Sequence, residues 1–474
     1  MERAALILSS TPAAGHRSLW LQEVAGDAPD APELTGAASA EVAIVGGGYV
    51  GLWTAIELKL REPALDVVLL EADICGSGAS GRNGGFAMTW WSKIAYMPRF
   101  VGDDEAVRLA RASVEGVDEI RQICLDHDVD CDFHADGWIW AAASEAQLGS
   151  WESTLSECRR LGVTPFRSLD PDDVARRTGS SLHRAGIFDP GTASLHPGKL
   201  ARGLRKIALR LGVRLHEHSP VLSLERRYPS TLRTPAGLLT AEKVVLATNV
   251  WAAGMPELRR YIVAISSDMV ATEPIPEKLE EIGWTGNECV SDSQMMIHYY
   301  RTTADGRIAF GKGGWGIAIG GRITRSFDRA PRRAQVVERN LRRLYPMLEG
   351  VRITHDWSGA IDRSVTGVPL IGYTGGRRHI VHAVGWSANA VGPARVGAKM
   401  IASLVQERDD EWSRSKLLSV RHEKFPPEPI RFAGAHVVRR GVVAKEEAEN
   451  RGREPGRLSR FLAAQAPSGQ IPAK

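Results

Sequence analysis

Apolar and polar positions follow two different periods within residues 41–71, EVAIVGGGYVGLWTAIELKLREPALDVVLLE. The continuous apolar run 42–45 predicts a short buried strand, and the apolar residues at 52, 55, 56 and 60 recur at helical spacing. A second apolar run, 67–70, predicts another strand. This order predicts a strand–helix–strand unit, the building block of parallel sheets.

Three glycines in G-x-G-x-x-G spacing, Gly46, Gly48 and Gly51, separate the first strand from the helix. The first permits a sharp turn, the second lets the backbone approach a pyrophosphate, and the third lets helix and strand pack closely. The helix N-terminus offers N–H groups to phosphate. Glu71, which stands 20 residues after Gly51, can accept hydrogen bonds from a ribose. Together these features favour dinucleotide binding over a chance glycine turn.

Hydrophobic periodicity elsewhere predicts alternating segments of two domains. Helices are expected at 104–128, 331–345 and from Pro393 onward, where proline suits the first helical position. Alternating residues at 296–320, with an A-D-G turn, predict antiparallel sheet. We predict an α/β chain (α+β overall) with a Rossmann-type cofactor-binding domain and a discontinuous antiparallel-sheet substrate domain. The expected boundaries are an N-terminal arm at 1–38, a cofactor domain at 39–95, 195–255 and 355–420, a substrate domain at 96–194 and 256–354, and a basic C-terminal tail at 421–474.

Composition narrows the class of protein. The length of 474 residues suits two domains. A net charge of +4 is too small to indicate nucleic-acid binding, and the basic excess lies in 421–474, where a solvated surface segment is the usual explanation. Five scattered cysteines without a C-x-x-C pair argue against disulfides and a metal site. No apolar stretch is long enough for a membrane span, so a cytoplasmic protein is expected.

Several motifs together resemble one family. They are GGGYVGLWTAIEL, LLEADICGSGASGRNGG, VVLATNVWA, GVPLIG and HAVGWSANAVGPARVGAKMIASL. Across roughly 40–420 the chain resembles the FAD-dependent amine and amino-acid oxidoreductases of the D-amino-acid oxidase (glycine/sarcosine oxidase-like) superfamily. It is most similar to the branch with gamma-glutamylputrescine oxidase and proposed aminophosphonate oxidoreductases. GASGRNGG is the most specific of these motifs.

The resemblance implies contacts along the whole length of FAD. The glycine turn flanks the pyrophosphate, Glu71 holds the adenosine ribose, and the helix after Pro393 points its N-terminus at the reduced flavin. Ala388 and Ala390 replace family glycines and narrow the backbone choices there. No cysteine stands where sarcosine-oxidase relatives attach flavin, so non-covalent FAD is expected. The implied cofactor residues are Gly46, Gly48, Gly51, Glu71, Ser80, Arg82, Asn83, Gly84, Gly85, Val221, Thr248, Trp251, Gly385, Ser387, Asn389, Val391 and Gly392.

Substrate-facing residues are harder to select. Strand alternation sends His298 and Tyr300 to one face and Tyr299 and Arg301 to the other, so only one pair can reach the site. Each candidate has an ordinary structural alternative: a polar-face histidine, a surface lysine or arginine, a core aromatic residue. The catalytic candidates are His298, Tyr300, Lys312 and Trp386; Arg301, Lys312 and Arg363 are the cations that an aminophosphonate would need, and Trp90, Trp91 and Asp362 are further candidates for the cavity wall.

The expected activity is oxidation of a C–N bond in a small amine or amino acid. A hydride would pass to flavin N5, and the imine product would hydrolyse to a carbonyl compound. The expected partners are a small-molecule amine and oxygen or another electron acceptor, without nucleic acid. Three alternatives stay open: a dehydrogenase that passes electrons to a quinone or carrier protein, an RNA-modifying flavoenzyme with RNA on the basic tail, and a flavin-binding protein without turnover.

Overall fold

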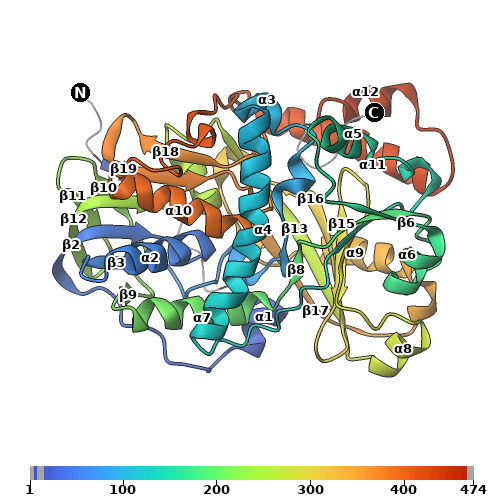
Figure 1. Ribbon diagram of the computed structural model, residues 1–474, viewed down its shortest axis with the longest axis horizontal. Helices are drawn as coiled ribbons and strands as arrows, with labels where there is room; N and C mark the ends of the chain where they lie inside the picture. Colours follow the sequence, from blue (N-terminus) through green and yellow to red (C-terminus); the bar gives the residue numbers. More distant parts are fainter. Residues whose placement is uncertain (1–4, 8–14, 467–474) are drawn as a thin grey trace.

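Two large sheets form the two lobes of the protein, whose computed structural model describes residues 5–7 and 15–466 (Figure 1). The first sheet has nine strands, and β12, β2, β3 and β9 run parallel, as does β19 beside β12. Its strands in spatial order are β1 (Ala5–Ile7), β10 (Ser223–Glu225), β11 (Ser230–Arg233), β12 (Gly237–Leu246), β2 (Gly36–Val45), β3 (Val67–Leu70) and β9 (Arg214–His216), with β19 (Arg377–Val384) also on β12 and β18 (Leu370–Thr374) on β19.

Helices α2 (Tyr49–Arg61), α7 (Pro197–Arg210) and α10 (Pro393–Val405) pack side by side on this sheet, as Figure 1 shows. Their buried faces carry the apolar positions of the helical period, so β2, α2 and β3 form the predicted strand–helix–strand unit. The long helix α4 (Asp103–Asp126) packs against α10 and joins the same core. This arrangement confirms the Rossmann-type lobe.

The second sheet is largely antiparallel, with one parallel pair, β14 and β5. The predicted hairpin joins β15 to β16. Its strands in spatial order are β17 (Ile353–Ser364), β13 (Ile262–Thr272), β16 (Ile308–Ile317), β15 (His298–Thr302), β14 (Cys289–Ser291), β5 (Trp138–Ala141), β7 (Gly186–Asp189) and β6 (Arg167–Leu169). A separate two-stranded sheet pairs β4 (Phe86–Ala87) with β8 (Ala193–Ser194).

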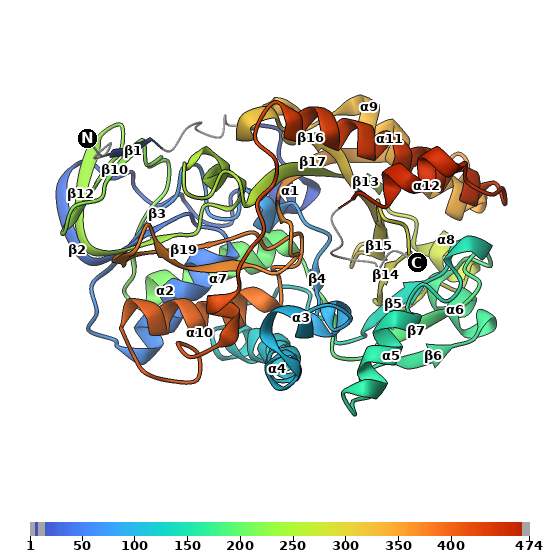
Figure 2. The same ribbon diagram turned by 90° about the horizontal axis from the view of Figure 1, so that it is seen from above.

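Shorter helices and the C-terminal pair complete the molecule. Helix α9 packs on β13 and β16, and α11 and α12 form a hairpin over the second lobe, which Figure 2 shows from above. The remaining helices are α1 (Leu19–Glu23), α3 (Pro98–Val101), α5 (Glu152–Arg160), α6 (Pro171–Thr178), α8 (Pro276–Glu281), α9 (Pro331–Leu344), α11 (Ile430–Asn450) and α12 (Arg457–Ala463).

Three expected boundaries differ from the structure. Strand β17 belongs to the second sheet because it pairs with β13 along almost its whole length, although 355–364 was assigned to the cofactor domain. Helix α4 was assigned to the substrate domain, but its buried face meets α10. The predicted solvated tail contains α11, and this helix is not solvated on all sides, since its Gly441, Val442 and Glu446 are buried. In each case, long-range pairing decides the position of the segment.

The N-terminal arm is fixed to the first lobe. Trp20 and Leu21 are buried, and the Trp20 indole donates a hydrogen bond of 2.9 Å to the Asn83 carbonyl. Farther along the arm, the Ala31 N–H donates to the carboxylate of Glu217, which has no exposed surface. The arm thus supports the loop that follows β3.

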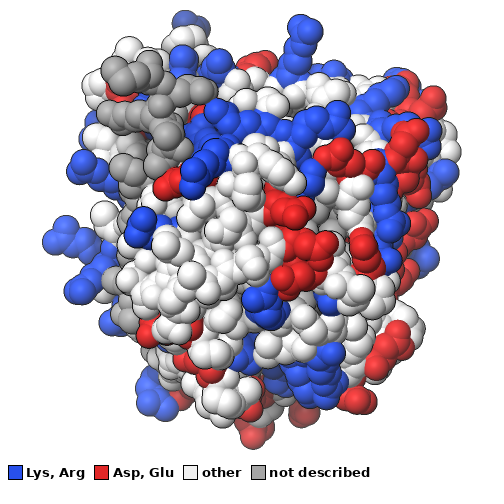
Figure 3. Space-filling model, turned by 90° about the vertical axis from the view of Figure 1, so that its left-hand side faces the viewer, with Lys and Arg blue, Asp and Glu red and all other residues white. Residues whose placement is uncertain are grey.

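The surface combines both signs of charge. On the face in Figure 3, a band of Lys and Arg runs across the upper part, and Asp and Glu lie directly below it. No helix within residues 5–7 and 15–466 has the length and apolar character needed to cross a membrane. Both signs of charge occur on the face in Figure 3, and Lys and Arg side chains cover only part of it.

Candidate active site

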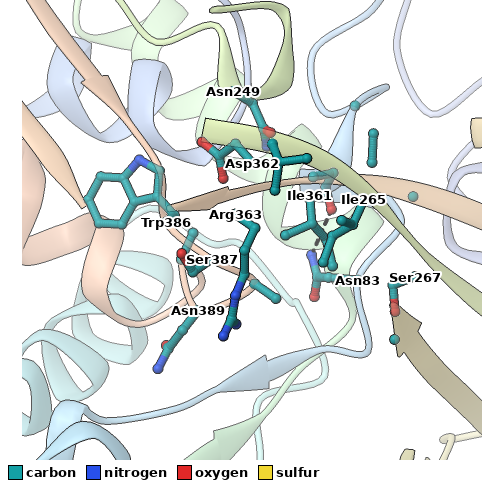
Figure 4. A pocket seen from close by; sticks show the side chains of 18 of the residues that line it. Asn83, Asn249, Ile265, Ser267, Ile361, Asp362, Arg363, Trp386, Ser387 and Asn389 are labelled. Atoms are coloured by element: carbon teal, nitrogen blue, oxygen red, sulfur yellow. Dashed lines mark hydrogen bonds between the residues drawn. The ribbon is translucent and has the colours of Figure 1, made fainter. Parts of the chain in front are cut away.

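A cavity of about 660 Å³ lies between the two lobes and extends along both (Figure 4). The glycine turn before α2, the loop after β3 and residues 220–222 form one end. Residues 359–363 of β17 and the loop 386–391 line its middle, and β15, β16 and α11 line the other end. One continuous space therefore connects the dinucleotide-binding turn with the antiparallel sheet.

The glycine turn leaves its backbone open to this cavity. Gly46 has φ +109°, and a Cβ there would stand 2.5 Å from the Ala247 carbonyl oxygen. A Cβ at Gly51 would overlap the Gly46 carbonyl oxygen. Gly48 caps α2 with no side chain across the helix end, so peptide dipoles face the space where a pyrophosphate would bind. The turn therefore needs glycine for the reasons that its spacing predicted.

Glu71 lies at the end of β3 and faces the same end of the cavity. Its Oε2 accepts a hydrogen bond of 2.6 Å from the Gly47 N–H, and its Oε1 accepts one of 3.0 Å from the Asp73 N–H. Burial raises the pKa of this carboxyl to about 6, although both N–H donors oppose that rise. Near neutral pH the carboxylate is thus placed to accept from ribose hydroxyls.

Two polar atoms at the first lobe's edge form no hydrogen bond within the described part of the chain. Thr248 and Asn249 line the cavity, and their Oγ1 and Oδ1 atoms are buried without a hydrogen bond to any described residue. Buried polar atoms are normally satisfied, so these two indicate a polar ligand or water in the cavity. Together with the turn and Glu71, this donor and acceptor set fits FAD.

Arg82 and Asn83 line the cavity, but their polar groups mainly hold the loop together. The Arg82 guanidinium donates to the Ser77 carbonyl at 2.8 Å and to the Ser358 carbonyl of β17 at 3.2 Å. The Asn83 amide donates to the Ser80 carbonyl at 2.7 Å and accepts from the Gly85 N–H at 2.8 Å. These side chains fix the loop between the lobes and present its backbone to the cavity.

Most positions predicted to contact the cofactor line the cavity: Gly46, Gly48, Glu71, Ser80, Arg82, Asn83, Gly84, Val221, Thr248, Trp251, Ser387, Asn389 and Val391. Four do not: Gly51, Gly85, Gly385 and Gly392. These four lie where backbones pack closely behind the cavity. A Cβ at Gly392, for example, would stand 2.6 Å from the Met88 carbonyl oxygen. These glycines therefore permit close packing behind the cavity surface, and their contact with the cofactor stays a prediction.

The loop before α10 is strained where the family glycine was replaced. Ser387 and Ala388 have φ +55° and +67°, a left-handed conformation that is unfavourable for residues with a Cβ. Asp362 fixes the start of the loop, because its carboxylate accepts a hydrogen bond of 2.5 Å from the Gly385 N–H and its backbone carbonyl accepts one of 3.4 Å from the Ser387 N–H. Burial raises the pKa of Asp362 to about 7. Strained backbone of this kind concentrates at functional sites.

Three of the four predicted catalytic residues do not line the cavity. His298, Tyr300 and Lys312 are buried among other side chains, while Tyr299 faces the cavity and shares a hydrogen bond of 2.7 Å with Ser267. Strand alternation explains the result, because His298 and Tyr300 point to the opposite side of β15 from Tyr299. The expectation that His298, Tyr300 and Lys312 face the substrate is thereby corrected.

Trp386 lines the cavity, but much of its ring serves packing. A Cβ at Gly397 of α10 would overlap its indole, and Figure 4 shows the ring turned away from Arg363.

Arg301 shares the face of Tyr299 yet does not line the cavity, because its guanidinium donates to the Gly84 and Leu195 carbonyls at 2.9 and 2.7 Å. Among the three predicted cations, only Arg363 lines the cavity.

The residues predicted for the cavity wall fall into two groups: Asp362 and Arg363 line the cavity, whereas Trp90 and Trp91 do not. Figure 4 shows Arg363 extending from β17 into the cavity, and Asp362 lines it as well. Burial lowers the pKa of the Arg363 guanidinium from its ordinary high value. An arginine side chain nevertheless stays charged in proteins. Trp90 and Trp91 belong to the core of the first lobe and do not line the cavity.

The sequence interpretation missed one complete wall. Residues of α11 line the cavity: Ile430, Arg431, Gly434, Ala435, Val438, Arg439 and Val442. Their spacing is helical, a signal present in the segment that was interpreted from its charge alone. Met295 and Met296 before β15 line the same end. Among the described residues, no group of His, Cys, Asp and Glu is arranged to hold a metal ion.

Comparison with known proteins identifies the family. A model of the family described as FAD dependent oxidoreductase (DAO) matches residues 41–404, which include the glycine turn, the whole second sheet and most of the first sheet and of α10. The chain belongs to this family. It is therefore an FAD-dependent oxidoreductase, and FAD is the dinucleotide that the glycine turn is predicted to bind. Helices α11 and α12 lie beyond the residues matched.

Relatives of this FAD-dependent oxidoreductase cover most of its length. It is 31% identical to gamma-glutamylputrescine oxidoreductase of Escherichia coli (strain K12) over 81% of this chain and 88% of that protein. It is 24% identical to glycine oxidase of Pseudomonas putida over 70% of this chain and 86% of that protein. The solved glycine oxidase from Geobacillus kaustophilus superposes with a TM-score of 0.66, at 22% identity, over 81% of this chain and 100% of that structure. That likeness confirms the predicted fold class.

Proposed function

We propose that this oxidoreductase oxidises a C–N bond of a small amine or amino acid to an imine, which water then hydrolyses to a carbonyl compound and ammonia or an amine. The bound flavin supplies the two-electron chemistry, with hydride transfer to its N5. The observation that carries the proposal is the continuous cavity from the glycine turn to Tyr299. The names of the relatives, gamma-glutamylputrescine oxidoreductase and glycine oxidase, support the choice of an amine or amino acid.

The chain's own residues divide the work of binding. At the second lobe, Tyr299 and Met295 provide an apolar wall that excludes water from the reacting carbon. Arg363 provides a permanent positive charge that binds an acidic group on the substrate. The ring of Tyr299 is held by its hydrogen bond to Ser267 and is thus a rigid surface.

FAD is held without a covalent bond in this proposal. All five cysteines are buried, and none of them lines the cavity among the described residues. The first test is therefore simple: acid precipitation of the purified protein should leave the yellow colour in the supernatant. Colour that stays with the pellet would contradict non-covalent binding.

The activity is tested by anaerobic bleaching of the visible flavin band. A panel of diamines, gamma-glutamyl amines, N-methyl amino acids and aminophosphonates covers the relevant amine classes. Bleaching by one class supports C–N oxidation, and readmission of air then distinguishes oxygen from another electron acceptor. A yellow protein that no amine bleaches, although dithionite does, would refute the proposal.

A single substitution tests the proposed role of Arg363. Arg363→Met should raise KM for amines that carry a carboxylate or phosphonate by about 10- to 100-fold, the value of a charge-assisted hydrogen bond. Amines without an acidic group provide the control and should change little. An equal loss for both groups of amines would assign Arg363 to the fold instead of the substrate.

A further inference from the structure

Helix α11 presents one face to the cavity, and the side chains along that face differ in size. Gly434 and Ala435 stand at its centre, between Ile430 on one side and Val438 and Val442 on the other. An ideal Cβ at Gly434 meets nothing within 4 Å. Gly434 is itself exposed, so the centre of the face is a hollow open to solvent, with room for a ligand between the flanking side chains.

The end of this wall closes on a pair of methionines. Val438 and Val442 pack with Met295 and Met296, and the Trp315 ring lies in the same cluster. Met295, Met296, Val438 and Val442 also line the cavity. Methionine adapts its shape to apolar ligands, so this end suits an aliphatic chain better than a charged group.

A buried polar network fixes α11 against the sheet. The carboxylate of Glu446 accepts a hydrogen bond of 2.7 Å from the Met296 N–H and lies 3.5 Å from the Lys312 ammonium. Lys312 donates to the Met296 carbonyl at 2.7 Å and to His298 Nε2 at 3.1 Å. Asp292 completes the network through a hydrogen bond of 2.6 Å to the His298 ring.

This network explains what His298 and Lys312 do in place of catalysis. Glu446 and Lys312 both bind the backbone of Met296, so they join α11 to the residue that ends the cavity. The Lys312 ammonium lies between the Glu446 carboxylate and the His298 ring, whose other nitrogen is hydrogen-bonded to Asp292, and Glu446, Asp292 and Lys312 are all buried. Removing one partner from a buried charge network is strongly destabilising locally, so the position of α11 depends on these residues.

We infer that α11 is the wall that selects substrates by the length of their aliphatic chain, and that Glu446 and Lys312 are its positioning residues. The inference rests on the proposed amine oxidation and deepens it. The amino group lies toward the middle of the cavity, and the chain extends along Gly434 to the methionines. Selection by length thus comes from a segment beyond the residues matched by the family model.

The test measures binding directly, by perturbation of the flavin absorption spectrum of the holoenzyme. Straight-chain primary amines from two to eight carbons serve as probes. In the unmodified protein, affinity should improve about fourfold per buried methylene until the chain reaches Met295 and Met296. In Gly434→Leu this improvement should stop at least two carbons earlier, because the new side chain occupies the hollow.

Ala433→Leu is the matched control. Ala433 is exposed and does not line the cavity, so the same substitution one position earlier should leave the length profile unchanged. Leucine favours helix over glycine, and Gly434→Leu should therefore fold at least as well as the original chain. Identical length profiles for the two variants would overturn the inference.

Glu446→Gln tests the positioning role. The neutral amide keeps the size of the side chain but leaves the Lys312 charge without this carboxylate. Discrimination between short and long amines should weaken by at least tenfold while FAD is retained and two-carbon amines bind as before. A uniform loss across all lengths would indicate a merely structural role. Because the spectral assay measures binding, the length profile is obtained even if no amine is oxidised, so the two proposals fail separately.

Discussion

Ala388→Gly should stabilise the protein, although glycine usually does the opposite. Ala388 has φ +67°, and left-handed backbone costs a residue with a Cβ roughly 1–2 kcal/mol. Glycine removes this cost but adds about 0.4–1 kcal/mol of conformational entropy to the unfolded chain. Since Ala388 is exposed, its methyl group contributes little packing. The balance is a gain of about 0.5–1 kcal/mol in the free energy of unfolding.

Guanidinium unfolding provides the measurement, with both holoenzyme and apoprotein. The gain should occur in both forms, because the strain belongs to the backbone. Ala390→Gly is the control: Ala390 lines the same cavity without a positive φ, so its replacement should cost about 0.4–1 kcal/mol. Ser387→Gly should gain less than Ala388→Gly, because the Ser387 hydroxyl accepts from the Ser364 N–H at 3.1 Å. A destabilised Ala388→Gly apoprotein would refute the strain argument.

Three further predictions concern the support of the cavity. Gly51→Ala should reduce FAD affinity by at least tenfold, measured by flavin retention, because its Cβ would overlap the Gly46 carbonyl oxygen; full retention would contradict this. Asp362 has a folded-state pKa of about 7, above its ordinary 3.8, so its contribution to stability is fully present below pH 4 and is lost as the pH rises through 7, by about 4 kcal/mol. Asp362→Asn should remove that dependence from unfolding curves measured between pH 4 and 8, and an unchanged slope would refute the assignment. Glu217→Gln should cost about 3–5 kcal/mol in chemical unfolding, because two arginines at 2.8 and 3.0 Å lose a fully buried partner; a cost below about 1 kcal/mol would show that the arm does not depend on this pair.

The strand–helix–strand unit was predictable because all of its signals lie close together in the sequence. Gly46, Gly48, Gly51 and Glu71 have fixed spacings, and each spacing has one physical explanation. The antiparallel hairpin at 296–320 was predictable for the same reason. Local patterns were sufficient wherever the partners of a segment follow it directly in the chain.

The face of β15 that meets the cavity could not be predicted in this way. Alternation separates His298 from Tyr299 but does not say which of them points toward the flavin side. That choice depends on what covers each side of the sheet, and α9 and α11 cover the side of His298. The charge of Arg82 likewise did not predict its role. Only the fold shows that its guanidinium donates hydrogen bonds to backbone carbonyls.

The C-terminal segment was misinterpreted because its net charge hid its periodicity. Lysines and arginines dominate the composition of the segment, although Arg431 and Arg439 of α11 line the cavity together with the small and apolar residues of its inner face. The partners of that inner face, Met296 and Lys312, stand more than a hundred positions earlier in the chain. No local rule connects them.

The position of α11 in the chain has a consequence for biosynthesis. A ribosome makes the glycine turn early and the helix that closes the cavity late, with both sheets in between. A nascent chain can therefore fold its first strand–helix–strand unit long before the pocket is complete. Nascent chains halted before α11 would present an open flavin site to solvent, so tight retention of FAD should begin only once translation has passed this helix.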